Sequence, residues 1–450
     1  MKLKINLTYI NIFIFISFFF LWGVDIVSLL KFNFIKSNPI LYDLLAQYKI
    51  TLKYLILILL LPIFFKLVKE IRFISFGKIF NDQKYILILA IFLILHFFSL
   101  KILNKQIIEI QEIIKIILFI LLSLIFCHYR FFFKKNFSDI IFIFLILFVF
   151  SAYYPSEYKF NVGQCNNKFF LFYFIENKFD IFIASTIFLE NSHMAMMMIA
   201  VLISTFMIIT TSKKIKFIYI FLILLSIVAV SLNYSTTFFI CYFVSFVVMV
   251  IFFHRKLPIK FWILAFLFLI LNASIFLTDS NCTKKVTDVS LTKILSKKID
   301  KIHDDNPSLA KNLTTLIYER SAIIALDTFQ NHPLGWGFDG MDNATSNLLN
   351  KEEYKDVFIY VRILNLNDGL SNFFKILTEF GIFSVFILYF FIRYIFNLKK
   401  ISPYNLFIIV LFLTLCVRGA GYFNGGFLFC LLEFFYIKKI NDYEYDTAIK

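Results

Sequence analysis

The feature that most constrains this chain is a series of apolar runs, each a candidate for a helix that crosses a lipid bilayer. A spanning helix needs about 20 mainly apolar residues, and about 17 is the lower end of the range. We place twelve such spans, some of them short. They cover Tyr9–Leu29, Lys53–Val68, Tyr85–Leu103, Ile113–Tyr129, Ile140–Tyr154, His193–Thr211, Phe217–Asn233, Thr236–Phe253, Phe261–Leu277, Glu379–Phe396, Leu406–Val417 and Gly426–Ile437. Composition agrees, because 60% of the 450 residues are hydrophobic, where soluble domains have about half.

Basic residues predict how these helices are oriented across the membrane. Alternate connections carry clusters of Lys and Arg, which mark the cytoplasmic side when they are counted over short loops. These clusters lie at residues 1–4, 66–78, 130–135, 213–216, 254–260, 393–400 and 438–439. Both termini are then cytoplasmic. The net charge of +16 has this topological explanation, and no basic face interleaved with aromatic residues suggests nucleic-acid binding.

Two longer connections fall on the side away from the cytoplasm. The shorter one covers residues 155–191, and the large one covers residues 278–370. The sequence therefore predicts an all-α polytopic membrane protein of about 12 transmembrane helices, with a large, partly helical loop between helices 9 and 10. Residues 1–277 hold the first nine helices, and residues 371–450 hold the last three and a cytoplasmic tail.

The large loop contains the densest polar chemistry of the chain. Residues 318–330 have helical spacing, and Asn331-His332-Pro333 is expected to end that helix, because proline restricts the residue before it. Gly335 and Gly337 then permit a tight turn. Exposed backbone amides in such a turn can bind an anion.

Three arginines lie against the orientation bias, at Arg320, Arg362 and Arg418. The planar guanidinium group suits bidentate binding of phosphate or carboxylate. For Arg362, a salt bridge with a neighbouring acidic residue is the structural alternative. For Arg418, at the end of an apolar helix, the alternative is an anchor that reaches the membrane surface.

Proton transfer has several candidates. His332 has a side chain suited to acid–base work near neutral pH, or it caps the preceding helix. Glu190 is a second candidate, just before the sixth span. His193 follows it at the start of that span, where Asn or Ser can cap a helix and where an anion is also favoured, so His193 is a candidate for substrate binding. Asp368 precedes a glycine just before the tenth span. Glu379, at the predicted start of that span, is explained by compensation of the helix dipole.

The six cysteines lack the spacing of a metal cluster, so we predict no metal and no cofactor. Four lie in or beside apolar runs and are expected to be buried small hydrophobes. Cys165 and Cys282 lie in the two long loops outside the cytoplasm, and a disulfide between them is a hypothesis.

Taken together, these features resemble the O-antigen polymerase and ligase superfamily of bacterial surface-glycan assembly. The matching pieces are the helix of Arg320 that runs into His-Pro-Leu-Gly-Trp-Gly-Phe, and Lys-Ile-Leu-Thr-Glu-Phe-Gly at residues 375–381. Residues 188–195 and 232–237 are also similar, and the order of helices and loops matches over the whole chain.

The resemblance implies a glycosyltransferase of lipopolysaccharide biosynthesis in the bacterial inner membrane, with its active face periplasmic. It would transfer a glycan from undecaprenyl pyrophosphate without a nucleotide sugar. Arg320, with Arg418, would hold the pyrophosphate leaving group, and a base would deprotonate the acceptor hydroxyl. The implied partners are the lipid-linked glycan, the membrane lipid and a possible chain-length regulator.

The sequence departs from the ligases of this superfamily. Ligases typically carry a His-Asn pair where Leu370 and Ser371 stand here, and an Arg that often follows the Ser-Thr-Thr segment is missing. The polymerase is therefore favoured, with His332, Glu190 and Asp368 as candidate acceptor bases. The ligase is the first alternative. A lipid-linked oligosaccharide flippase or other transporter is the second, and the nearly uncharged helix interiors count against it.

Overall fold

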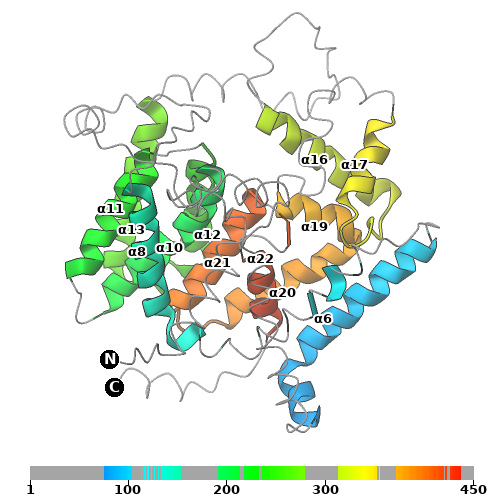
Figure 1. Cartoon of the computed structure of the whole chain (residues 1–450), viewed down its shortest axis with the longest axis horizontal. Coiled ribbons are helices and arrows are strands. Elements are labelled where there is room, and N and C mark those ends of the chain that lie inside the picture. Colours follow the sequence, from blue (N-terminus) through cyan, green and yellow to red (C-terminus); the bar gives the residue numbers. More distant parts are fainter. Residues whose placement is uncertain are drawn as a thin grey trace, which may run out of the picture.

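The computed structural model describes residues 76–103, scattered positions between 113 and 130, and residues 133–153, 191–212, 217–232, 236–278, 313–351, 354, 371–419, 421–422 and 426–436. Within these ranges every regular element is a helix, so the all-α prediction is confirmed there (Figure 1). The first two apolar runs, the 155–190 loop, and residues 279–312 and 355–370 of the large loop lie outside the described residues.

The described helices follow the predicted apolar runs closely. In chain order they are α6 (Phe76–Leu103), α8 (Phe137–Tyr153), α10 (Asn191–Thr211), α11 (Phe217–Leu232), α12 (Thr236–Phe253), α13 (Ile259–Thr278), α16 (Leu313–Asn331), α17 (Met341–Leu349), α19 (Asn372–Phe380), the 3-10 turn η3 (Gly381–Phe383), α20 (Ser384–Asn397), α21 (Pro403–Val417) and α22 (Phe427–Phe435). The predicted helix of the large loop is α16, and it ends two residues before Pro333, as expected.

Two helices begin earlier than hydropathy alone predicts, because each has a serine cap. The hydroxyl of Ser371 accepts a hydrogen bond from the Phe374 amide, which starts α19 at Asn372. Ser402 accepts from the Asn405 amide, with proline in the first turn of α21. Ser at the N-cap and Pro at the first helical position are both favourable. The tenth predicted span is therefore α19, η3 and α20 together, and it begins before Glu379.

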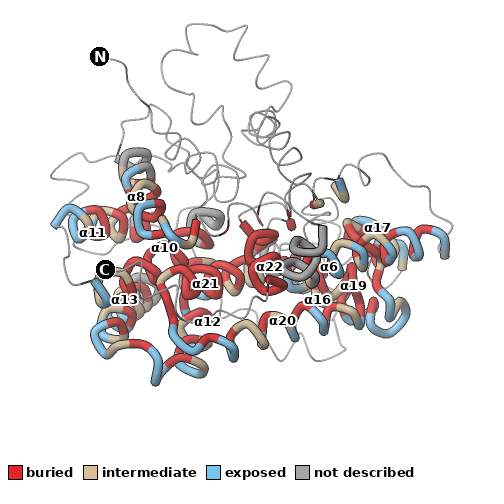
Figure 2. Tube along the Cα trace, turned by 90° about the horizontal axis from the view of Figure 1, so that it is seen from below, coloured by how far each residue is buried: buried red, intermediate tan, exposed pale blue. Residues whose placement is uncertain are grey.

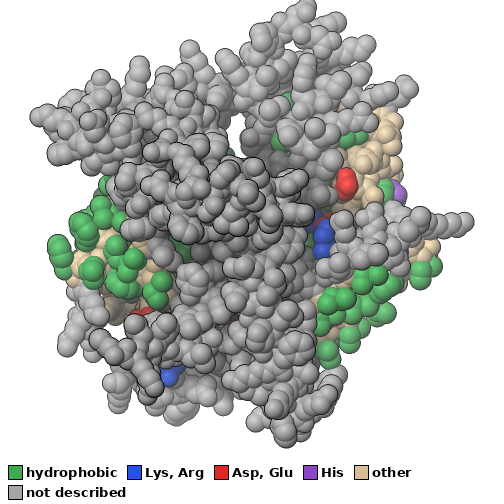
Figure 3. Space-filling view, in the orientation of Figure 1, with side chains coloured by type: hydrophobic (Ala, Val, Ile, Leu, Met, Phe, Trp, Pro, Cys, Tyr) green, Lys and Arg blue, Asp and Glu red, His purple; other side chains and the backbone are tan. Residues whose placement is uncertain are grey.

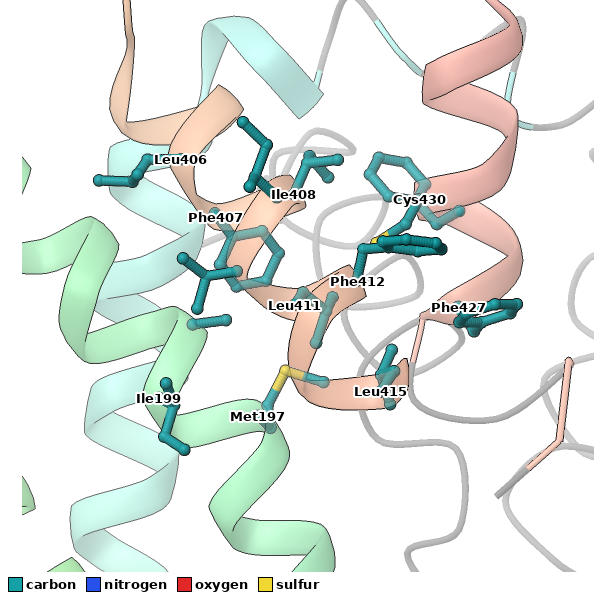
Figure 4. Close-up of a cluster of buried hydrophobic side chains, with 14 of the residues drawn as sticks. Met197, Ile199, Leu406, Phe407, Ile408, Leu411, Phe412, Leu415, Phe427 and Cys430 are labelled. Carbon is teal, nitrogen blue, oxygen red and sulfur yellow. The ribbon is translucent and has the colours of Figure 1, made fainter. Parts of the chain in front are cut away.

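The core of the molecule lies along α10, α21 and α22 (Figure 2). Both α10 and α21 are apolar on all sides, as expected of a helix surrounded by others. In Figure 4, Phe407, Leu411 and Phe412 of α21 lie between side chains of α10 and α22. The buried hydroxyls of Ser204 and Thr205 in α10 donate to the carbonyl of Val201 at 2.8 and 2.6 Å, so their polar groups are satisfied within the helix.

The outward faces of the peripheral helices are apolar. Leu95, Phe217 and Phe386 are each more than half exposed. On α6 the exposed residues recur at helical spacing, at Ile88, Ile91, Leu95, Phe98 and Ile102. Figure 3 shows hydrophobic patches over α11 and α13 and over α6. Contiguous exposed apolar surface of this kind marks contact with a membrane or a partner.

Length and composition give two candidate membrane spans among the described residues, at Tyr85–Ile102 and Asn372–Asn397. Shorter apolar helices occur in α8, α10, α11, α12, α13 and α21. Apolar helices of this kind are compatible with a membrane protein.

Contacts between the helix ends fall into two groups, one at each end of the bundle. At one end, which we call the basic end, the Lys256 ammonium donates to the Leu398 carbonyl at 2.8 Å, and Arg393 lies over the ring of Tyr85. At the other, the polar end, the Thr414 hydroxyl donates to the Met196 carbonyl at 3.1 Å. Segments predicted on one side of the membrane therefore contact one another.

Arg130 differs from its predicted role as an orientation signal. It is 5% exposed, and its guanidinium donates to both carboxylate oxygens of Glu433 in α22, at 2.7 and 2.6 Å. The Tyr404 hydroxyl donates to the same carboxylate at 3.0 Å, and the Tyr436 ring packs on the guanidinium. Arg130 therefore fixes α22 to the core at the basic end.

We expect Glu433→Ala to destabilise the protein by about 3–5 kcal/mol, because it leaves the buried Arg130 charge without its carboxylate. The double variant Arg130→Met, Glu433→Leu should recover most of that loss. The measurement is thermal unfolding of detergent-purified protein. Equal losses in the single and double variants would contradict this interpretation of the pair.

Candidate functional site

Two of the sequence segments that carry the resemblance meet at the polar end. The turn after α16 lies against the end of α19, and three backbone hydrogen bonds join them. The amides of Trp336 and Gly337 donate to the carbonyls of Thr378 and Glu379 at 3.1 and 2.9 Å, and the Ile382 amide donates to the Pro333 carbonyl at 2.9 Å. We call residues 333–337 and 378–382 together the backbone interlock.

The interlock depends on two glycines at its closest approach. A Cβ atom on Gly335 would lie 2.3 Å from the Glu379 carbonyl oxygen, and one on Gly381 would lie 2.2 Å from the Pro333 carbonyl oxygen. Their φ angles of +84° and +50° are also in the region that favours glycine. No other residue type fits these two positions without backbone movement.

The expected anion-binding amides are not available in this turn. The Gly335 amide donates to the His332 carbonyl at 2.7 Å, and the Gly337 amide donates to Glu379 in the interlock. The prediction that Gly335 and Gly337 expose amides to a substrate is therefore wrong. Both amides hold the turn in place.

Arg320 lies on the buried face of α16 and is 0% exposed. Ile317 and Ile324, one turn to either side, pack against α17. Burial lowers the pKa of the Arg320 guanidinium to about 10, so the group stays protonated near neutral pH. A cation held in a buried position is suited to stabilise charge that develops on a substrate.

Arg418 follows α21 at the same end of the molecule and is half-buried. The Tyr318 hydroxyl of α16 donates to the carbonyl of Val417, the residue before it, at 2.6 Å. Burial raises the pKa of Tyr318, and the positive charge of Arg418 offsets part of that rise. The Tyr318 hydrogen bond thus holds α16, the helix of Arg320, next to Arg418.

The start of α19 completes this region. Ser371 donates through its hydroxyl to the Cys416 carbonyl at 2.6 Å, and the Gly421 amide donates to the side-chain oxygen of Asn372 at 3.1 Å. The first turn of α10, which contains His193, lies one turn before the Met196 carbonyl that Thr414 contacts. The side chain of His193 lies outside what the structure describes.

A cluster of charged side chains in this region was missed by the sequence interpretation. Lys115 forms an ion pair with Asp339, and the Lys375 ammonium lies 3.7 Å from Asp339 and 2.8 Å from Glu379. Tyr422 packs its ring 5.1 Å from the Lys375 ammonium. In Figure 3, basic and acidic side chains come to the surface near each other beside α17 and α19.

Glu379 does not have the role that the sequence predicts for it. It is the penultimate residue of α19 and fully buried, whereas dipole compensation requires an acidic residue at the start of a helix. Its partner is Lys375, four residues earlier on the same buried face. That spacing is the one signal in the sequence that could have indicated the pair.

His332 has a structural role at the end of α16. Its backbone amide donates to Thr328 at 2.8 Å, and its ring lies 4.2 Å from the ring of Trp336. Its catalytic role stays a prediction. The His96 ring of α6 also contacts this turn, through Nε2 to the Leu334 carbonyl at 2.9 Å.

The remaining candidates are not placed by the structure. Glu190, Asp368 and Arg362 lie outside the described residues, as do Cys165 and Cys282. The cysteines that are described, Cys241, Cys416 and Cys430, are free thiols at buried or half-buried positions, as predicted for residues in apolar runs. Within the described part of the chain, no group of three or more His, Cys, Asp or Glu side chains is arranged to hold a metal ion.

Comparison with known proteins gives no match to a family model, to a curated protein or to a solved structure.

Proposed function

We propose that this protein is a glycosyltransferase of the bacterial inner membrane that polymerises oligosaccharide repeat units carried on undecaprenyl pyrophosphate. The observation that carries the proposal is the arrangement of the polar end. Two of the segments that resemble the O-antigen polymerases are interlocked there, and they bring the helix of Arg320 next to Arg418.

The two arginines fit the leaving group of such a reaction. As the acceptor oxygen bonds to the anomeric carbon, the bond from that carbon to the pyrophosphate oxygen breaks, and its electron pair leaves with the pyrophosphate. The acceptor proton goes to a base. Fixed cations near the leaving oxygen stabilise the charge that develops there. A guanidinium group can also bind two phosphate oxygens at once.

The outer surface supports a location in the membrane. The exposed apolar faces of α6, α11, α12, α13 and α20 fit contact with lipid chains, and the basic connections at residues 254–260 and 393–400 meet at the end opposite Arg418. With the basic end cytoplasmic, the interlock and both arginines face the periplasm. There they could meet a lipid-linked glycan after its transfer across the membrane.

Two observations favour a polymerase over the alternatives. Ser371, where ligases carry part of a His-Asn pair, is a helix cap bonded to the Cys416 carbonyl. For a flippase, charged groups are expected along a central cavity. The buried ion pairs that the structure describes lie instead at the two ends, at Arg130–Glu433 and at Lys375–Glu379.

Surface-glycan typing of a strain that lacks the gene tests the function. A core that carries a single repeat unit, restored to a ladder by complementation, is the expected result for a polymerase. Accumulated full-length chains that are not linked to the core would indicate a ligase. A normal ladder in the deletion strain would overturn the proposal.

The proposed orientation makes a separate prediction. We expect a reporter fused after Asn350 to be periplasmic, and reporters fused after Lys256 or Lys400 to be cytoplasmic, because the basic connections mark the inner side. Paired phosphatase and fluorescent-protein fusions measure this directly. A cytoplasmic signal at Asn350 would remove the proposed active face.

A further inference from the structure

Asp339 has an unusual backbone. Its φ angle is +66°, and among the described residues it is the non-glycine residue that lies in this region. Asp and Asn tolerate this conformation better than other side chains, at some cost in energy. The turn that holds it is fixed on both sides, because the Gly337 amide is bonded in the interlock and the Gly340 amide donates to the Gly337 carbonyl at 2.9 Å.

The strained backbone places an accessible carboxylate beside a buried charge pair. The side chain of Asp339 is 20% exposed, while those of Lys375 and Glu379 are 2% and 0% exposed. Lys375 is nearer to Glu379, at 2.8 Å, than to Asp339, at 3.7 Å. Lys375 therefore lies between the two carboxylates, and the side chain of Lys115, the other partner of Asp339, is 34% exposed.

Asp339 also lies close to the arginine region. The preceding residue, Phe338, stacks its ring on that of Tyr422, with the ring centroids 5.5 Å apart. Tyr422 is four residues beyond Arg418 in the chain. Lys375 lies one helical turn after Asn372, whose side chain bonds the Gly421 amide. The segment that follows Arg418 thus contacts both the residue before Asp339 and the start of α19.

We propose that Asp339 is the base that accepts the proton from the acceptor sugar hydroxyl. This inference rests on the proposed function. In the transfer step, the hydroxyl proton passes to the Asp339 carboxylate while the oxygen bonds to the anomeric carbon. The bond to the pyrophosphate oxygen breaks, and the leaving group takes its electron pair. Of the two carboxylates next to Lys375, Asp339 is the one that reaches solvent, at 20% exposed against 0% for Glu379.

A comparison of three variants separates this role from a structural one. Asp339→Asn keeps the side-chain shape and tolerates the positive φ angle, but it cannot accept the proton. Lys115→Gln breaks the same ion pair and leaves the carboxylate in place. Arg320→Ala reports on the proposed function itself. Each variant is expressed in the deletion strain at matched membrane abundance, and polymer formation is followed from the cell's own lipid-linked oligosaccharide pool.

We expect Asp339→Asn to reduce the rate of polymer formation at least about 100-fold, as for loss of a general base. Lys115→Gln should reduce the rate of polymer formation much less. Equal losses in these two variants would show that the ion pair, not the base, matters, and would overturn the inference. A normal rate in Asp339→Asn with no polymer in Arg320→Ala would overturn the inference alone. Normal rates in both would count against the proposed function as well.

Discussion

Arg320→Ala abolishes the long glycan ladder while the protein still inserts in the membrane: this is the first expected result. The guanidinium is fully buried on α16, next to the segment of Arg418. A fixed charge aimed at a leaving group contributes about 100- to 1,000-fold in rate. Arg320→Lys keeps the charge but loses the planar fork, so it should restore only part of the polymer. The measurement is the ladder from the complemented deletion strain at equal protein abundance.

The matched control is Arg255→Ala, which removes an exposed arginine at the basic end and should leave the ladder unchanged. His332→Ala should have a mild effect if His332 only packs on Trp336, and a severe one if it also transfers a proton. A full-length ladder from Arg320→Ala would exclude this residue from pyrophosphate binding.

Gly335→Ala should destabilise the protein far more than Gly337→Ala. Both glycines have nearly the same φ angle, +84° and +87°, so the cost of a left-handed backbone is common to both. The two positions differ only in the space available for a Cβ atom. A Cβ atom on Gly335 would lie 2.3 Å from the Glu379 carbonyl oxygen, whereas one on Gly337 would meet the Leu100 side chain at an ordinary 3.5 Å.

We expect Gly337→Ala to cost about 1–3 kcal/mol of backbone strain. Gly335→Ala must also break the interlock, so it should largely prevent accumulation of folded protein. Thermal unfolding in detergent and protease resistance in membranes measure the difference. Equal stability of the two variants would show that the interlock does not limit stability.

The sequence predicted the helices well because their signal is local. Apolar runs gave the bounds of α12 as observed, and Pro333 gave the end of α16. The serines that extend α19 and α21 are also local signals, since a cap bonds an amide three residues ahead. Hydropathy alone overlooked them because a serine lowers the apolar average at the very point where it starts a helix.

The candidate site was only partly predictable because its contacts are not local. Lys115 and Asp339 are separated by 224 positions, and Arg130 and Glu433 by 303. Nothing in a basic loop distinguishes an arginine that orients the chain from one that is buried against a carboxylate. The Gly337 amide was similarly misjudged, because its acceptor, the Glu379 carbonyl, lies about 40 residues further along the chain, whereas the Gly335 amide is taken up within its own turn by the His332 carbonyl.

The lengths of the last two helices have a consequence for where the proposed chemistry takes place. At 1.5 Å per residue, the 15 residues of α21 extend about 22 Å and the 9 residues of α22 about 14 Å. A bilayer has a hydrocarbon core of about 30 Å. If α21 starts at the inner surface in the proposed orientation, Arg418 would lie below the outer surface of the membrane. Non-helical backbone at that depth must be enclosed by protein or face water, and the neighbouring Gly419, Gly421 and Tyr422 are buried. A polyprenyl carrier could thus present its pyrophosphate from the side, with its hydrocarbon tail still in the lipid.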